Sequence, residues 1–243
     1  MSLTAKLLLS PLLVAQAVAT RSRMPRLPEA AGERSGEVGR GPPLRLLILG
    51  DSSAVGVGVA RQQDALAGHL PQALADQCGV HVRWELLARS GVSSAACLQM
   101  LEAEFKGSAD IAVVVLGVND VVEQVASQRA VRSRESIANR LRNAHGVSHV
   151  VFAPLPPVGR FPGLPQPLRW VAGRDAQRHD QAVAAWSQTR EDVSHVPIDM
   201  PLNRGVMAPD GFHPGAPVYR VCAVALAEHI ATQVWPRLRP GPA

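Results

Sequence analysis

The chain is organised around the sequence LRLLILGDSSAVGVGV, which runs from Leu44 to Val59. Its apolar run stops abruptly at Gly50, a pattern typical of a buried strand that meets a tight turn. Ser52 follows that turn, where open α/β sheets bind their ligands. A hydroxyl group at this place can act as a nucleophile, with a backbone N–H beside it to bind an oxyanion.

The same stretch admits two other interpretations. Ser52 could cap the helix that is expected after the turn. A glycine-rich phosphate loop is the second, built on Gly50, Gly56 and Gly58. Its spacing fits poorly, because the Gly-Lys-Ser/Thr ending of a P-loop is absent and Arg61 stands where a dinucleotide-binding loop has a small residue. The rest of the chain has to decide between them.

Length and composition favour one sizeable globular domain. The 243 residues are 47% hydrophobic, enough for a full core. The net charge of +5 comes from scattered arginines, and few aromatics accompany them, so no nucleic-acid partner is expected. Cys78, Cys97 and Cys222 form no ligand cluster, so neither a metal site nor a disulfide framework is expected.

Two segments precede the domain. Residues 1–20 are apolar but short for a membrane span, and fit either a signal peptide or an uncleaved helix that packs on the domain or contacts a membrane peripherally. Residues 21–43 are rich in Pro, Gly and Arg and are expected to be an extended linker without a core of its own. Exported, membrane-associated and cytoplasmic locations all stay open.

Residues 44–243 alternate between strand and helix patterns. Strands are expected at 44–49, 80–88, 111–116, 149–153 and 193–198, and helices at 56–76, from Ser93 or Ser94, and at 129–144, 168–189 and 216–234. Such alternation predicts a central parallel sheet of about five strands, covered on both faces. In the first helix Pro71 is expected to bend or divide the helix, and Gly79 to cap it.

Polar residues follow the expected strands. Ser52 comes after the first strand, Gly91 after the second and Asn119 after the third, whereas Asp210 and His213 follow the fifth after a loop. Because parallel strands end at one edge of the sheet, these residues are expected to converge there. Acyl transfer needs a nucleophile, a base, a group that orients the base, and oxyanion donors, without any cofactor or metal.

Four sequence blocks resemble the motif blocks of the SGNH (GDSL-type) hydrolases, in the same order. They are Gly50-Asp51-Ser52, Gly91, Gly117-Val118-Asn119-Asp120 and Asp210-Gly211-Phe212-His213-Pro214. The resemblance covers about residues 44–235 and implies a flavodoxin-like three-layer α/β/α fold and an esterase. It implies that Ser52 is the nucleophile, His213 the base and Asp210 the carboxylate that orients it. It likewise implies an oxyanion hole made by Ser52, Gly91 and Asn119.

The expected substrate is an ester of a small molecule, a lipid or an acetylated glycan, cleaved through an acyl-enzyme on Ser52. An acyltransferase or a glycan deacetylase would use the same residues, because only the group that attacks the acyl-enzyme differs. A non-catalytic α/β binding module is a third possibility, and it predicts that Ser52 and His213 lie out of reach of each other. Neither the substrate nor the oligomeric state follows from the sequence.

Other polar residues have plainer expected roles. Asp51 should hold the turn, Asp120 should cap the next helix, and His179 should be a partnered core histidine. Arg89 should lie on the surface. The proline-rich segment 154–167 leaves the active edge of the sheet, and is either part of the acyl or alcohol pocket or a stiff connector.

Overall fold

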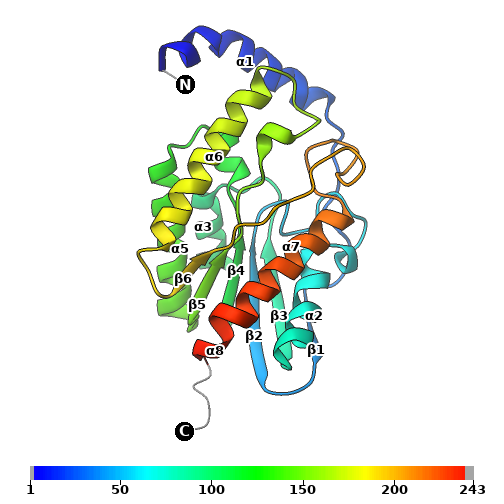
Figure 1. The fold of residues 1–243 in the computed structure, drawn as a ribbon, viewed down its shortest axis with the longest axis vertical. Helices are drawn as coiled ribbons and strands as arrows, with labels where there is room; N and C mark the ends of the chain where they lie inside the picture. Colours follow the sequence, from blue (N-terminus) through cyan, green and yellow to red (C-terminus); the bar gives the residue numbers. More distant parts are fainter. Residues whose placement is uncertain (1–2, 239–243) are drawn as a thin grey trace.

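The apolar strand quoted first lies in the middle of a six-stranded sheet. The computed structural model describes residues 3–238. Its strands run in the order β1-β3-β2-β4-β5-β6, and all neighbours are parallel except β1 and β3. Helices cover both faces (Figure 1), so the predicted three-layer α/β/α fold is confirmed.

The elements have the following bounds. The strands are β1 (Ser35–Gly39), β2 (Pro43–Gly50), β3 (His81–Ala88), β4 (Ile111–Val115), β5 (His149–Phe152) and β6 (Val193–His195). The helices are α1 (Leu3–Arg23), α2 (Leu66–Cys78), α3 (Ser94–Glu104), α4 (Val118–Val122), α5 (Ser127–His145), α6 (Leu168–Ser187), α7 (Ala216–His229) and α8 (Trp235–Leu238). The described residues also contain two 3-10 turns, η1 (Gln62–Asp64) and η2 (Val158–Arg160), and one π-helical turn, η3 (Ile230–Val234).

The side chains of β2 alternate between two apolar layers, as the pleat of a strand requires. Leu46 and Ile48 pack with residues of α2 and α7 on one face. Leu47 and Leu49 pack with residues of α3 and α5 and with the end of α6 on the other. All four leucine and isoleucine side chains are buried. The apolar run therefore forms a strand covered on both faces, which explains why it lacks polar positions.

The segment 21–43, expected to be a linker, contributes to the fold. Its residues Ser35 to Gly39 form β1, which pairs antiparallel with β3 and adds a sixth strand to the five that were expected. Helix α1 also extends into this segment as far as Arg23. β1 contains one large apolar residue, Val38, opposite Val82. Its strand conformation depends on pairing with β3, and a local pattern could not reveal it.

The expected helix at 56–76 begins ten residues late. Residues 51–65 form turns and η1, and α2 starts at Leu66. Gly56 and Gly58 have φ values of 83° and 107°, a left-handed conformation that a helix does not accept. Pro71 lies inside α2 and does not divide it, whereas Gly79 caps its end as predicted, with a left-handed conformation.

Helix α1 crosses the end of the molecule to which the carboxyl ends of the parallel strands point (Figure 1). Within residues 3–238, no helix meets the length and apolarity that a membrane crossing needs. The helix is joined to the domain near the start of α6 through Gln16, whose amide nitrogen donates to the carbonyl of Gln166 at 2.7 Å.

The turn between β1 and β2 yields a stability prediction. Gly39 and Gly79 both have left-handed φ values, but a Cβ on Gly39 would clash with the Val80 carbonyl oxygen, whereas a Cβ on Gly79 meets nothing within 4 Å. We expect Gly79→Ala to lower the free energy of unfolding by about 1–2 kcal/mol. Gly39→Ala should cost a further ~1–3 kcal/mol, because the backbone must move. Urea unfolding of both variants measures this difference, and equal losses would contradict the close approach of β1 to Val80.

Candidate active site

The register of the central strands brings three candidate site residues to one level. Gly50 lies opposite Ala88 of β3 and opposite Val115 of β4. Ser52, Gly91 and Asn119 therefore leave the same edge of the sheet within a few residues of the strand ends. This is the convergence that the sequence predicted for a parallel sheet.

Gly50 is required for space rather than for an unusual backbone angle. A Cβ at this position would clash with the Val115 carbonyl oxygen and would lie 2.8 Å from the Ala54 Cβ. The same carbonyl accepts a hydrogen bond from the Asp51 N–H at 3.1 Å. The turn that carries Ser52 is thus pressed directly against the end of β4.

Ser52, His213 and Asp210 form a connected chain of hydrogen bonds. His213 Nε2 lies 3.1 Å from Ser52 Oγ, and His213 Nδ1 lies 2.6 Å from Asp210 Oδ2. Asp210 Oδ1 accepts the backbone N–H groups of Phe212 and His213 at 2.9 and 3.0 Å. The distance between Ser52 and His213 contradicts the separation that a non-catalytic binding module predicts.

The environment of Asp210 favours its ionised form. Burial alone would raise the pKa of this carboxyl, but the hydrogen bonds from the His213 side chain and from the two backbone N–H groups outweigh burial and lower the pKa. An ionised Asp210 accepts a hydrogen bond from His213 Nδ1–H and so fixes the imidazole tautomer. The lone pair of Nε2 is then directed at the Ser52 hydroxyl, as a general base requires.

The loop that carries His213 is held from two sides. The backbone N–H of Ala208 donates to the His213 carbonyl at 3.0 Å, and Met207 pairs with Pro214 in an antiparallel bridge. On the other side the Gly163 N–H donates to the Gly211 carbonyl at 2.9 Å. The proline-rich segment 154–167 therefore supports the loop of His213 directly.

The side-chain amide of Asn119 has a fixed orientation. Its Nδ2 donates to the Val92 carbonyl at 3.0 Å and lies 3.4 Å from Asp51 Oδ2. Gly91, next to Val92, has a φ of 82°, which favours glycine. Asn119 in α4, Gly91 and Ser52 thus all follow strand ends at one edge of the sheet.

Asp51 holds the turn after β2, as expected. Its Oδ1 accepts a hydrogen bond from the Ser53 N–H at 2.9 Å, and the residue is buried. Burial raises the pKa of the Asp51 carboxyl to about 6, although the Ser53 N–H opposes this shift.

The expectation that Asp120 caps the next helix is wrong, because Asp120 lies within α4 and the N-terminus of α5 has no side-chain cap. Its carboxylate is buried and accepts the Ser94 N–H at 2.9 Å and the Ser94 hydroxyl at 2.6 Å. It also pairs with Arg134 Nη1 at 3.2 Å, and the Arg134 side chain is only 1% exposed. Arg134 Nη2 donates to the Leu116 carbonyl at 3.2 Å. Asp120 and Arg134 thus tie the turn of Asn119 to α3, to α5 and to the end of β4.

Sequence reasoning missed Arg134, although a signal was present. Helical spacing places Arg134 between Ala130 and Ile137 on the apolar face of α5, where a cation needs a buried partner. Neither Ser93 nor Ser94 caps α3 with its side chain, because Ser94 binds Asp120 instead.

Three further expectations concern His179, Arg89 and segment 154–167. His179 is a buried, partnered histidine, with Nε2 3.0 Å from the Val125 carbonyl oxygen. Arg89 lies on the surface and pairs with Glu104. In segment 154–167, Phe161 packs in a small apolar cluster with Met207, and its ring meets the Phe212 ring edge to face with centroids 5.1 Å apart. The segment therefore does more than connect β5 to α6.

A three-layer α/β fold that brings serine, histidine and aspartate together at the edge of its sheet is the kind of arrangement that hydrolases use. The model of the GDSL-like lipase/acylhydrolase family matches residues 48–221, and the chain belongs to this family.

Similar proteins agree with this membership. The GDSL-like esterase Rv1075c of Mycobacterium tuberculosis is 29% identical over 232 residues, which are 87% of this chain and 73% of that protein. The lipase Lip_vut3 from a goat rumen metagenome has a TM-score of 0.61 at 18% identity, over 78% of this chain and 98% of that chain. A family two carbohydrate esterase from Clostridium thermocellum has a TM-score of 0.60 at 13% identity, over 82% of this chain and 67% of that chain. The two structures show the fold alone.

The buried ion pair under Asn119 predicts a large loss of stability. Arg134→Met leaves the Asp120 carboxylate buried without its cation, so we expect the free energy of unfolding to fall by about 3–5 kcal/mol. Arg132→Met is the matched control, because Arg132 lies exposed on the same helix and should change stability by less than about 0.5 kcal/mol. Chemical denaturation measures both values. Similar small losses in the two variants would show that the pair does not support the fold.

The raised pKa of Asp51 predicts a pH effect on stability. Between pH 4 and 6 the folded protein keeps the Asp51 proton that the unfolded chain has already lost, so rising pH destabilises the fold. The shift of the Asp51 pKa from 3.8 to about 6 corresponds to roughly 3 kcal/mol. Asp51→Asn keeps an acceptor for the Ser53 N–H but cannot titrate. The stability of the wild type relative to this variant should therefore fall between pH 4 and 7, and a constant difference would contradict the shift.

Proposed function

We propose that the protein hydrolyses carboxylic esters through a covalent acyl-enzyme on Ser52. The observation that supports this proposal best is the 3.1 Å distance between Ser52 Oγ and His213 Nε2, with Asp210 on the other ring nitrogen. Membership of the GDSL-like lipase/acylhydrolase family supports the same reaction class. The relative from Mycobacterium tuberculosis is itself described as a GDSL-like esterase.

The first half of the proposed reaction forms the acyl-enzyme. The Ser52 oxygen attacks the carbonyl carbon of the ester while its proton passes to His213 Nε2. The carbonyl oxygen becomes an oxyanion that accepts the N–H groups of Ser52, Gly91 and Asn119. The intermediate then collapses, the bond to the alcohol oxygen breaks, and His213 returns the proton to the departing alcohol.

The second half regenerates the serine. Water attacks the acyl carbon and gives one proton to His213, and the tetrahedral intermediate expels the Ser52 oxygen, which takes that proton back. Asp210 stabilises the imidazolium in both halves without being protonated itself. An alcohol in place of this water would give acyl transfer, so the test below includes an analysis of the products.

Part of the substrate site is proposed to lie beside His213. The Phe212 ring, backed by the buried Phe161 ring, lies next to the imidazole and forms an apolar wall, with Phe212 and His213 centroids 5.2 Å apart. An acyl or alcohol group of the ester can pack on this wall. Segment 154–167 supplies Phe161, which supports the Phe212 ring from inside the protein.

Replacing the proposed nucleophile gives the most direct functional prediction. We expect Ser52→Ala to lower kcat/KM for p-nitrophenyl esters by a factor on the order of 10⁵ or more. Ser53→Ala is the matched control, because the next serine contacts Asp51 through its backbone N–H and not through its hydroxyl. It should keep activity within about threefold.

The assay uses p-nitrophenyl acetate and longer acyl esters, and free acid and acyl-alcohol products are quantified with an alcohol added. Full activity in Ser52→Ala, or equal losses in both serine variants, would refute the assignment of the nucleophile. Acyl-alcohol as the main product would show that the protein is a transferase.

Removal of a proposed oxyanion donor should lower activity less than removal of the nucleophile. We expect Asn119→Ala to lower kcat by about 10²–10³-fold with little change in KM, because the amide acts on the transition state and not on the bound ester. Steady-state kinetics on the p-nitrophenyl ester that the wild type hydrolyses fastest separates kcat from KM. A change confined to KM would place Asn119 in ground-state binding instead.

A further inference from the structure

Exposed apolar side chains gather at one end of the molecule. Among the side chains that the structure describes, seven large apolar residues are exposed, and four of them lie on α1 and on the first turn of α6. These four are Leu12, Val14, Val18 and Trp170, with exposed fractions of 47, 62, 64 and 46%. We call them, with the surface between them, the α1–α6 face. Val14 and Val18 lie one turn apart on the same side of α1, whereas Leu12 lies on another side of the helix, so the two valines form the apolar stripe of this face.

One side of α1 is attached to the domain, so its outer side is free. Leu9, Leu13 and Gln16 are half-buried and follow helical spacing along the inner side. Gln16 donates to the Gln166 carbonyl at 2.7 Å and accepts the Leu168 N–H at 3.1 Å. These bonds leave Val14 and Val18, one turn apart, pointing outward.

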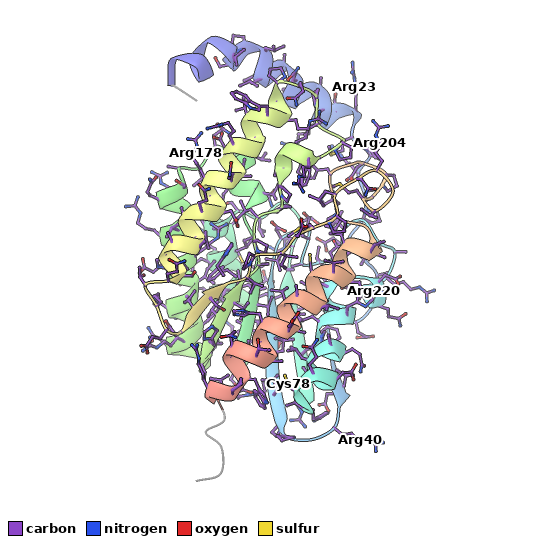
Figure 2. The ribbon with its side chains drawn as sticks, viewed as in Figure 1. Arg23, Arg40, Cys78, Arg178, Arg204 and Arg220 are labelled. Carbon is purple, nitrogen blue, oxygen red and sulfur yellow. The ribbon has the colours of Figure 1, made fainter. Side chains whose placement is uncertain are left out.

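The two segments that form this face are basic, and acids follow directly after them at Glu29 and Asp175. Residues 9–28 and 161–174 contain no aspartate or glutamate, but they contain five arginines. These are Arg21, Arg23, Arg26, Arg169 and Arg174. The Arg174 guanidinium lies over the Trp170 ring, 5.8 Å from its centroid. Figure 2 shows Arg23 at the C-terminal end of α1 and Arg204 in the loop beneath that end.

This combination favours a lipid surface over a second copy of the chain. Apolar side chains flanked by arginines fit the boundary between acyl chains and anionic headgroups of a bilayer. Two copies of the same face would bring like charges together, which opposes a symmetric dimer. The complementary charge is therefore that of an anionic phospholipid bilayer.

The α1–α6 face is also connected to the catalytic loop. The segment that Gln16 binds includes Gly163, whose N–H donates to the Gly211 carbonyl at 2.9 Å. Phe161 of the same segment meets Phe212, the residue before His213. The face and the carboxyl ends of the strands lie at one end of the molecule (Figure 1).

We propose that the α1–α6 face docks on an anionic phospholipid bilayer and that the enzyme takes its ester substrate from that bilayer. Docking through this face presents the edge that carries Ser52 to the lipid. The substrate class is then a lipid acyl ester, whose acyl chain can pass from the bilayer to the Phe161–Phe212 wall. The substrate part of this proposal rests on the proposed function, whereas the docking part does not.

The experiment measures vesicle binding by the full chain. Wild type and variants are sedimented with vesicles of phosphatidylcholine alone or with phosphatidylglycerol added. The test variant is Val14→Glu/Val18→Glu, which places acid on the outer side of α1. Its matched control is Val221→Glu/Val224→Glu, which makes the same change at two exposed valines on α7. Each variant is also assayed on soluble p-nitrophenyl acetate, which reports an intact fold.

We expect the wild type and the α7 control to bind vesicles that contain phosphatidylglycerol at least tenfold better than phosphatidylcholine vesicles. The α1 variant should lose at least tenfold in this binding and in hydrolysis of a vesicle-borne acyl ester, while it keeps the soluble-ester rate. Alkaline carbonate should release the bound wild type from the vesicles.

The docking proposal fails if the wild type does not bind vesicles or binds neutral vesicles equally well. It also fails if the two double variants lose binding equally, or if the protein is a dimer in solution that only the α1 variant dissociates. Resistance to carbonate would also overturn it, because α1 would then be inserted rather than docked. The two proposals fail separately. Vesicle binding without any esterase activity would contradict the proposed function alone, and soluble esterase activity without vesicle binding would contradict docking alone.

Discussion

The site depends on one constraint, which is that three parallel strands end at the same height in the sheet. Gly50, Ala88 and Val115 lie opposite one another, so the chain leaves β2, β3 and β4 at the same height. A slip of one residue in either pairing would turn the strand's side chains to the other face and displace the turn that follows. The core packing that fixes the register therefore also fixes the spacing between Ser52, Gly91 and Asn119.

Two buried supports then hold the functional groups that the strands bring together. The pair of Asp120 and Arg134, with Ser94, lies under the turn of Asn119 and is closed to solvent. Segment 154–167 holds the loop of His213 through Gly163 and Gly211. Both supports hold the segments of the candidate site against the core, so the candidate residues need little reorganisation to keep their positions.

Most of the fold and the candidate site could be predicted from the sequence, because the central strands β2 and β4 contain apolar runs and the candidate residues follow strand ends. The misses have a common cause in contacts between distant segments. β1 has too few apolar residues for a pattern, and its conformation depends on β3. Glycine is needed at position 58 because a side chain there would clash with the Pro214 carbonyl oxygen, far along the chain. A local pattern cannot reveal such a contact. Asp120 was expected to cap the next helix, whereas in the structure it pairs with Arg134 of α5.

The central claim is that Ser52 carries the acyl group, and trapping that intermediate tests it most directly. The protein is mixed with a p-nitrophenyl ester, quenched in acid within the first turnovers, digested, and its peptides are sequenced by mass spectrometry. The account predicts an acyl group on Ser52 in the wild type and none in His213→Gln, which lacks the base. An acyl group on Ser53 or on another residue, or ester turnover with no covalent species at any quench time, would contradict it.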